Sequence, residues 1–361
     1  MPQTDWLFFR TALLDWYEPE RRPMPWKGEP DPYRVWLSEI ILQQTRVAQG
    51  LPYFERFVAA YPTVTDLAGA DDDAVLKLWE GLGYYSRARN LLRAARTVAN
   101  DLDGHFPDTY TGLKALPGVG PYTAAAIASF AFGRQVAVLD GNVYRVIARF
   151  AGDEAPTDGS SGRKHFQQAV DQAMGDTHAA DFNQAIMDFG ALVCTPRNAA
   201  CPSCPLAKQC KARAKGTVYD LPVKKKSITK RSRYFHYLVI KDTKGSFLLQ
   251  QRTTKDIWQS LYEFPLIEAD TTDLRLRQLM ESEAWPTWLE PNRITEGKRS
   301  LVYRQQLSHQ TILAVFHQIE WRAPTKLPDR FVRIDRAAHS AYALPRVINR
   351  YLEDGTLTLD L

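Results

Sequence analysis

Cysteine is the residue type whose spacing points most directly to chemistry. The chain of 361 residues has four cysteines, all in one short window with the spacing C-x6-C-x2-C-x5-C: Cys194, Cys201, Cys204 and Cys210. Paired disulfides are not expected in so tight a window of a chain that we expect to be cytoplasmic. Four thiolates fit tetrahedral zinc or a cubane iron–sulfur cluster, although zinc ribbons usually present two C-x2-C knuckles and this window has one. The spacing predicts a metal centre and leaves the metal open.

A glycine-rich turn indicates a second kind of chemistry. The sequence LPGVG at residues 116–120 precedes a helix of small residues at 123–129. This pattern is typical of a helix–hairpin–helix, in which backbone amides around Gly118, Val119 and Gly120 face a phosphate and the next helix N-terminus adds partial positive charge. Such a contact does not depend on base sequence. A plain helix–helix turn is the alternative.

Two acidic residues are candidates for acid–base work, and each also has an ordinary structural interpretation. Asp140 stands in the sequence VLDGNV at residues 138–143, where it is suited to cap the helix that begins near Val143. Glu39 stands on a helix with apolar periodicity, where a glutamate is most often a surface residue. From these residues alone, the structural interpretations are favoured.

Positive charge is concentrated in one block. The formal net charge is +5, but residues 208–233 carry ten Lys or Arg and one acid, a local charge of +9, so the rest of the chain sums to −4. The block is either a solvated linker or a strap across nucleic-acid phosphates. Charge alone favours the linker. Because the block begins inside the four-cysteine window, its first part, with Lys208, Lys211 and Arg213, is predicted also to touch phosphates.

Composition and length limit the class of protein. Hydrophobic residues make up 45% and charged residues 24%, ordinary values for a globular chain, and the length fits two or three domains. The longest apolar run, at 124–132, is about half of the roughly 18 residues that a membrane span needs. The first residues do not resemble a signal peptide. We therefore expect a soluble cytoplasmic protein with no membrane partner.

The elements that must position these residues fall into two halves. Residues 1–210 read as mainly helical, with a helix start at Asp31-Pro32 and further helical stretches at 74–80, 87–99, 122–132, 143–150 and 164–174. From Tyr234 onward the pattern alternates, which predicts strands at 235–240, 246–251 and 311–319, with helices near 274–280 and 344–352. The second half is therefore expected to be an α+β domain.

The order of these motifs carries a family resemblance. LPGVG, LDGNV about 20 residues later and then a four-cysteine loop occur in this order in one superfamily. The chain resembles the helix–hairpin–helix DNA glycosylases of the endonuclease III type, and within them the A/G-specific adenine glycosylases, from about residue 5 to its C-terminus. The sequence SEIILQQT at residues 38–45 belongs to that branch.

The resemblance implies a fold and an activity. The expected fold is a helical glycosylase domain at 1–215 with a [4Fe–4S] cluster on the four cysteines, a basic linker at 216–233 and a Nudix/MutT-like domain at 234–361. The implied activity is base excision repair: hydrolysis of the N-glycosidic bond of adenine paired with 8-oxoguanine or guanine. The expected partner is double-stranded DNA with these mispairs, and the enzyme is expected to be a monomer.

The resemblance also assigns roles at the reaction centre. Glu39 is the implied general acid, and Asp140 is implied to stabilise or trap the oxocarbenium ion, as in a retaining glycosidase. Tyr122 and Asn142 are implied to hydrogen-bond around Asp140. Bifunctional relatives have a nucleophilic lysine where this chain has Tyr122, so strand cleavage by that route is not expected.

Residues around the two bases are implied in the same way. Arg22, Trp26 and Gln184 match positions of the adenine pocket. Four further residues match positions that intercalate or lie near the opposite base: Gln44, Thr45, Leu82 and Tyr84. The LPGVG turn, with Gly118, Val119 and Gly120, is implied to bind DNA.

The second domain lacks the glutamate-rich Nudix box that holds magnesium, so it is expected to be a non-hydrolytic relative. Ser308 and His309 match an F-S-H loop implied to recognise 8-oxoguanine. The Phe position of that loop is Leu307 here, which puts stacking by that residue in doubt.

Three other functions are alternatives for this sequence. A related glycosylase with another base preference would act on thymine or uracil in mismatches. A non-catalytic DNA-binding protein with a redox-sensing cluster is disfavoured by the intact pair Glu39 and Asp140. A Nudix nucleotide hydrolase is disfavoured by the missing acidic box.

Overall fold

Contacts divide the chain into two compact units. The structure, a computed structural model, describes residues 4–18, 22–224, 230–242, 245–322 and 330–357. One unit comprises Met1–Ala70 and Asn90–Ser227, and the other comprises Asp71–Arg89 and Ile228–Leu361. The segment 71–89 lies inside the mainly helical half of the sequence but packs within the second unit.

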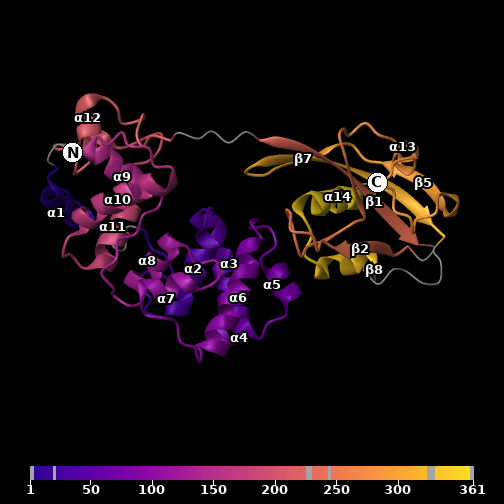
Figure 1. The fold of residues 1–361 in the computed structure, drawn as a ribbon, viewed down its shortest axis with the longest axis horizontal. Helices are drawn as coiled ribbons and strands as arrows, with labels where there is room; N and C mark the ends of the chain where they lie inside the picture. The colour runs from indigo at the N-terminus through magenta and orange to yellow at the C-terminus, as the bar shows by residue number, and fades with distance from the viewer. Residues whose placement is uncertain (1–3, 19–21, 225–229, 243–244, 323–329, 358–361) are drawn as a thin grey trace. The chain divides into compact units, whose positions relative to one another are not determined.

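The first unit is helical, as expected (Figure 1). Its helices are α1 (Trp6–Trp16), α2 (Pro32–Leu42), α3 (Val47–Ala60), α4 (Val64–Ala68), α7 (Tyr110–Ala115), α8 (Pro121–Phe130), α9 (Gly141–Ala151), α10 (Gly159–Met174), α11 (Ala179–Leu192) and α12 (Lys211–Lys215). Helix α6 (Ser86–Asp101) begins in the second unit and ends in the first. Among the described residues, no helix is both long and apolar enough to cross a membrane.

Helix α2 begins where the sequence indicates. The side chain of Asp31 accepts a hydrogen bond from the amide of Tyr33 at 2.9 Å, and Pro32 occupies the first turn. The helix is buried along residues 35–41, including Glu39. It is therefore an internal helix, and the apolar stripe predicted from the sequence is only part of its buried surface.

The LPGVG segment forms the turn between α7 and α8. Gly118 has a φ of +75°, and a Cβ at this position would come within 2.6 Å of Cβ of Asn90. Only glycine fits both constraints. Alanines 124–126 in α8 are buried, which allows neighbouring helices to approach closely.

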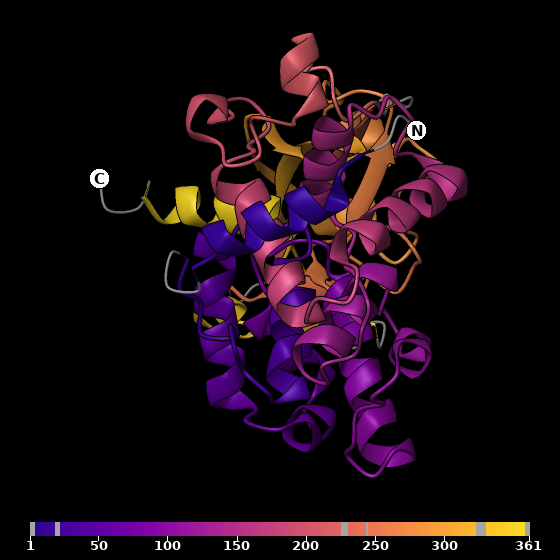
Figure 2. The same ribbon diagram turned by 90° about the vertical axis from the view of Figure 1, so that its left-hand side faces the viewer.

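An aromatic core joins α1 to the later helices of the first unit. The ring centroids of Phe9 and Phe150 lie 4.8 Å apart, and Phe182 lies 6.5 Å from Phe9. Arg10 of α1 donates to the carbonyl of Met174 at the end of α10 at 3.1 Å. Figures 1 and 2 show α1 beside the magenta helices α10 and α11.

The second unit is built on one mixed sheet. The main strand order is β3-β2-β1-β7-β5, with β4 on β1, β6 on β7 and β8 on β2. The strands are β1 (Arg231–Asp242), β2 (Phe247–Gln251), β3 (Tyr262–Glu263), β4 (Leu266–Ala269), β5 (Ile294–Arg299), β6 (Tyr303–Gln306), β7 (Gln310–Trp321) and β8 (Phe331–Ile334). The long central pair, β1 and β7, is parallel from Arg231↔Gln310 to Asp242↔Trp321.

Two helices cover the sheet, which confirms an α+β domain. Helix α14 (Arg346–Leu357) packs on one face, where the rings of Phe316 and Tyr351 stack with centroids 4.0 Å apart. Leu276 and Leu279 of α13 (Leu276–Met280) belong to a hydrophobic cluster that also contains Leu238 of β1. Figure 1 shows α14 in yellow against the strands of this unit.

Some residues of the basic block, 208–233, form hydrogen bonds within the protein. Arg233 binds Asp256 through both terminal nitrogens, at 3.0 and 2.8 Å, and donates to both carboxylate oxygens of Glu268 at 2.6 Å. Lys211 donates to the hydroxyl of Thr4 at 3.1 Å. Residues 225–229 of the block lie outside the described residues. Arg233 is therefore not a phosphate contact, whereas phosphate contacts near Lys208 stay a prediction.

One buried amide fixes the segment that leads into Asp140. Asn183, fully buried on α11, donates to the hydroxyl of Ser129 at 2.9 Å and to the carbonyl of Val136 at 2.8 Å. Its oxygen accepts from the amide of Val138 at 3.0 Å.

We expect Asn183→Ala to lower the free energy of unfolding by about 2–4 kcal/mol, because it leaves buried backbone groups without partners. Urea unfolding measures this loss. The exposed Asn100→Ala should change the value by no more than about 0.5 kcal/mol. Equal effects of the two variants would contradict the role of Asn183.

Candidate active site

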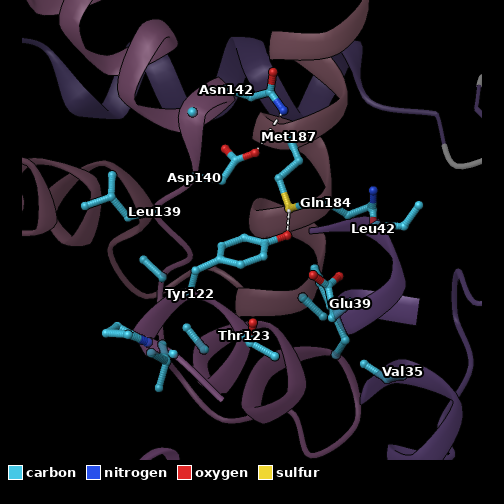
Figure 3. A pocket seen from close by; sticks show the side chains of 18 of the residues that line it. Val35, Glu39, Leu42, Tyr122, Thr123, Leu139, Asp140, Asn142, Gln184 and Met187 are labelled. Carbon is cyan, nitrogen blue, oxygen red and sulfur yellow. Dashed lines mark hydrogen bonds between the residues drawn. The ribbon is translucent and has the colours of Figure 1, made fainter. Parts of the chain in front are cut away.

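The first unit contains a cavity of about 1520 Å³. Its wall includes residues of α2, α8, α9 and α11, and Figure 3 shows Tyr122 projecting between Asp140 and Glu39. All four residues implied at the reaction centre line this cavity: Glu39, Tyr122, Asp140 and Asn142. The structure thus brings together side chains that are about 100 residues apart in the sequence.

Glu39 projects from α2 into the cavity wall and is 6% exposed. The interpretation of Glu39 as a surface residue is therefore wrong. Its pKa is raised to about 7: burial raises it most, a hydrogen bond from Tyr122 lowers it, and the charge of Asp140 adds a smaller increase. Burial raises the pKa because a carboxylate loses hydration when it is removed from water. Glu39 can therefore hold a proton near neutral pH.

Asp140 has a different environment. It caps α9, as the structural interpretation predicted: one oxygen accepts from the amide of Val143 at 2.8 Å, and the other accepts from the side-chain amide of Asn142 at 2.9 Å. Burial raises the pKa of Asp140, but both donors and the nearby Arg145 favour the ionised form. The helix N-terminus also favours negative charge at this position.

Arg145 supports this arrangement from within α9. Its guanidinium donates to the side-chain oxygen of Asn142 at 2.9 Å and to the carbonyl of Gly190 at 2.6 Å. A Cβ at Gly190 would come within 2.7 Å of Cβ of Asn142, so glycine lets α11 approach the start of α9. The orientation of Asn142, and through it of Asp140, is fixed by these contacts.

Tyr122 lies near both carboxyl groups and is hydrogen-bonded to Glu39. It stands in the first turn of α8, and its hydroxyl lies 3.9 Å from Sδ of Met187, as drawn in Figure 3. Burial raises the pKa of Tyr122 well above its ordinary value, and the charges of Glu39 and Asp140 add to this effect. The hydroxyl is therefore protonated and serves as a donor.

The residues expected around the adenine pocket meet at a buried acid. Arg22 and Lys27 pair with the carboxylate of Asp188 at 2.9 and 2.7 Å, and the side-chain amide of Gln184 donates to it at 3.2 Å. Trp26 is buried in the same wall. Arg22 is thus an ion-pair partner of a buried acid.

Sequence reasoning missed Asp188 and Met187. Met187 and Asp188 follow Gln184 on α11 at i+3 and i+4, so helical spacing indicates that all three share one face of the helix. The charged partners of Asp188, Arg22 and Lys27, are however more than 160 residues away in the sequence, and no local pattern reveals them.

The residues expected to contact DNA divide between the two units. Gln44, Thr45, Gly118 and Gly120 line the cavity, and Val119 is buried behind it.

The other four, Leu82, Tyr84, Ser308 and His309, belong to the second unit and do not line that cavity. Leu82 is buried, whereas Tyr84 is 42% exposed and its hydroxyl is hydrogen-bonded to that of Ser308.

The cysteine loop packs against the core of the first unit. The pKa of the Cys204 thiol is raised to about 11: burial raises it most, a hydrogen bond from the backbone of Leu206 lowers it, and charge on the other three cysteines adds a smaller increase. Arg149 of α9 donates to Sγ of Cys194 at 3.5 Å and to the carbonyl of Thr195 at 2.7 Å. The four thiols therefore lie near one another with a cation beside them.

Comparisons with known proteins agree with this architecture. Residues 37–171 match the model of the HhH-GPD superfamily base excision DNA repair proteins, and residues 236–354 match the NUDIX domain. A solved structure of a thermostable thymine-DNA glycosylase is similar, with a TM-score of 0.54 and 30% identity over 58% of this chain and 97% of that one. The helical glycosylase fold and the Nudix-like domain expected from the resemblance are confirmed.

Two curated relatives are informative. The adenine DNA glycosylase of Buchnera aphidicola subsp. Baizongia pistaciae is 32% identical, covering 85% of this chain and 84% of the relative. The adenine DNA glycosylase of Homo sapiens is 43% identical over 57% of this chain and 39% of its own length. The chain belongs to the adenine DNA glycosylase family of base excision DNA repair enzymes.

Proposed function

We propose that the enzyme removes adenine paired with 8-oxoguanine or guanine in duplex DNA, with Glu39 as general acid and Asp140 as stabiliser of the sugar cation. The observation that carries this proposal is the unequal environment of the two carboxyl groups in one cavity. Burial favours a protonated Glu39, whereas Asp140 accepts two hydrogen bonds at the start of α9.

The reaction needs this division of roles. When the bond between adenine N9 and C1′ breaks, the electron pair stays on the base and the deoxyribose becomes oxocarbenium-like. Proton transfer from Glu39 to N7 neutralises the departing base. Ionised Asp140 stabilises the cation or traps it covalently, and water then adds at C1′ and returns a proton to Glu39. Tyr122 and Asn142 orient the two carboxyl groups.

The same site predicts a monofunctional enzyme. Strand cleavage by β-elimination requires an amine that forms a Schiff base with the sugar. The residue at the matching position is Tyr122, whose pKa burial raises well above its ordinary value. We therefore expect an abasic site as the product, and strand breaks only after alkaline treatment.

The target base must leave the helix to reach this cavity, as in other base-excising enzymes. The glycine-rich turn 116–120 is suited to bind the backbone phosphate, because Gly118 and Gly120 have no side chains and the N-terminus of α8, which begins at Pro121, adds partial positive charge. Tyr84, Gln44 and Ser308 are proposed to read the base opposite the adenine. Arg22, Trp26 and Gln184 are proposed to surround the extruded adenine.

We propose that the four cysteines, Cys194, Cys201, Cys204 and Cys210, would hold a [4Fe–4S] cluster, as the family resemblance implies. Arg149 beside Cys194 suits a cluster of negative net charge. When bound, the cluster supplies a rigid, structural link between the loop and α9.

A second candidate is a preference for another base. The similar solved structure is a thymine-DNA glycosylase, so the fold is compatible with more than one target. A panel of duplexes with A, T or U opposite G and 8-oxoguanine separates the two. Release of adenine alone supports the proposal, and release of thymine or uracil at a higher rate contradicts it.

Replacement of the acid tests the mechanism. We expect Glu39→Gln to bind A:8-oxoguanine duplex normally but to lose adenine release by a factor of about 100 to 10,000, the usual contribution of a general acid. Single-turnover assays with alkaline treatment measure this. The exposed Glu55→Gln on α3 serves as the matched control and should excise at the wild-type rate. Near-normal excision by Glu39→Gln would refute the assignment.

The pH dependence follows from the raised pKa of Glu39. The protonated form is active, so the single-turnover rate should fall as pH rises through about 7, approaching a tenfold loss per pH unit above it. Because the folded state holds this proton more tightly than the unfolded chain, the contribution of Glu39 to stability is full below its ordinary pKa and is lost as pH rises through about 7. Glu39→Gln should therefore be more stable than the wild type at alkaline pH. A rate that falls only with the ordinary glutamate pKa of 4.5 would contradict this account.

Metal analysis tests the cofactor. We expect purified protein to contain about four irons and four acid-labile sulfides per chain and to lack stoichiometric zinc. Cys204→Ser should lower iron content and destabilise the first unit, as measured by thermal unfolding. One zinc per chain in the wild type would contradict the cluster.

A further inference from the structure

A row of charged side chains on α5 (Asp72–Leu78) and its following turn contacts the sheet domain within the second unit. Asp73, Lys77 and Glu80 follow one another at i, i+4 and i+7, so they share one face of the helix. We call these three residues the α5 stripe. Each of them makes a hydrogen bond to a residue beyond position 250.

Glu80 holds the start of α14. One carboxylate oxygen accepts from the backbone amide of Leu344 at 2.9 Å and from the side-chain amide of Asn349 at 3.0 Å. The other oxygen pairs with Lys77 at 2.5 Å, and Lys77 also donates to the carbonyl of Tyr342 at 3.1 Å. Negative charge is favourable at this end of a helix.

Asp73 and Arg89 make contacts at the other end of the segment. Asp73 accepts from the hydroxyl of Tyr262 at 2.8 Å and from the side chain of Gln251 at 3.2 Å. Arg89 in α6 donates to the carbonyl of Gln259 at 2.6 Å. Hydrogen bonds to the sheet domain therefore lie on both sides of the loop that carries Tyr84.

The loop itself is held in an unusual backbone conformation. Tyr84 has a φ of 49°, a left-handed conformation that is uncommon for a side chain of this size. The indole of Trp79 donates to the carbonyl of Gly83 at 3.0 Å, and Arg87 donates to the same carbonyl at 3.3 Å. Surrounding contacts must maintain such a conformation.

We propose that the α5 stripe is a specificity-positioning surface: it fixes the Tyr84 loop to the sheet that carries Ser308, so that one rigid unit reads the base opposite the target adenine. The juxtaposition of Tyr84 and Ser308 then depends on the whole row of contacts and not on the single bond between their hydroxyls. This inference rests on the proposed role of these two residues at 8-oxoguanine. The chemical step in the first unit does not depend on the stripe.

The test is a comparison of two substitutions at one position. Glu80→Leu removes both acceptors, whereas Glu80→Gln keeps one oxygen that can accept from Leu344 and Asn349. Single-turnover rates of the full-length enzyme are measured on A:8-oxoguanine and A:G duplexes. We expect Glu80→Leu to lower the ratio of the two rates by roughly 10-fold, with the A:G rate within about twofold of the wild type, and Glu80→Gln to retain most of the ratio.

Two further measurements separate positioning from general damage. Tyr262→Phe removes only the hydroxyl bonded to Asp73 and keeps the ring contact with Tyr342, whose centroid is 4.8 Å away, so it should lower the ratio in the same direction but less. Hydrogen exchange at residues 81–85 should be faster in Glu80→Leu and unchanged in Glu55→Leu.

An unchanged ratio in Glu80→Leu, or an equal loss of both rates, would overturn the inference. The proposed function fails in a different way: the wild type itself would then release no adenine, or would show no preference for 8-oxoguanine over guanine.

Discussion

The loss of hydration at one carboxyl group, Glu39, is the constraint on which the site depends. A glutamate in the middle of a buried helix is costly unless it keeps its proton or gains donors. Its pKa of about 7 is a compromise between burial and the hydroxyl of Tyr122. Asp140, at the start of α9, receives donors from the backbone and from Asn142 instead. Two chemically similar groups thus become an acid and an anion.

Helix α9 links this constraint to the rest of the first unit. Asp140 caps its N-terminus. Arg145 in the middle of the helix donates to Asn142, and Arg149 in its last turn donates to Cys194. Arg145 also donates to the carbonyl of Cys194 at 2.6 Å. The cysteine loop and the reaction centre are therefore attached to the same helix. A cluster on these cysteines would therefore be linked to the reaction centre through α9.

Local features of the fold and site could be predicted from the sequence, whereas long-range ones could not. The caps Asp31 and Asp140 and the sheet pattern after residue 230 follow from residue type and spacing. The burial of Glu39 does not, because an amphipathic pattern identifies one apolar face and α2 is buried on more than one.

Contacts between residues that are distant in the sequence could not be predicted either. Asp188 meets Arg22 and Lys27 only after folding, and β1 pairs with β7 across an intervening stretch of about 70 residues. The packing of residues 71–89 within the second unit likewise depends on contacts with side chains beyond residue 250.

Direct titration of Glu39 is the most decisive measurement. Infrared difference spectra of the wild type minus Glu39→Gln, recorded across the pH range, isolate the stretching band of the Glu39 carboxylic acid. We expect this band to disappear with a midpoint near pH 7. A midpoint near the ordinary glutamate value of 4.5 would show that Glu39 is ionised at neutral pH and would contradict its role as the acid.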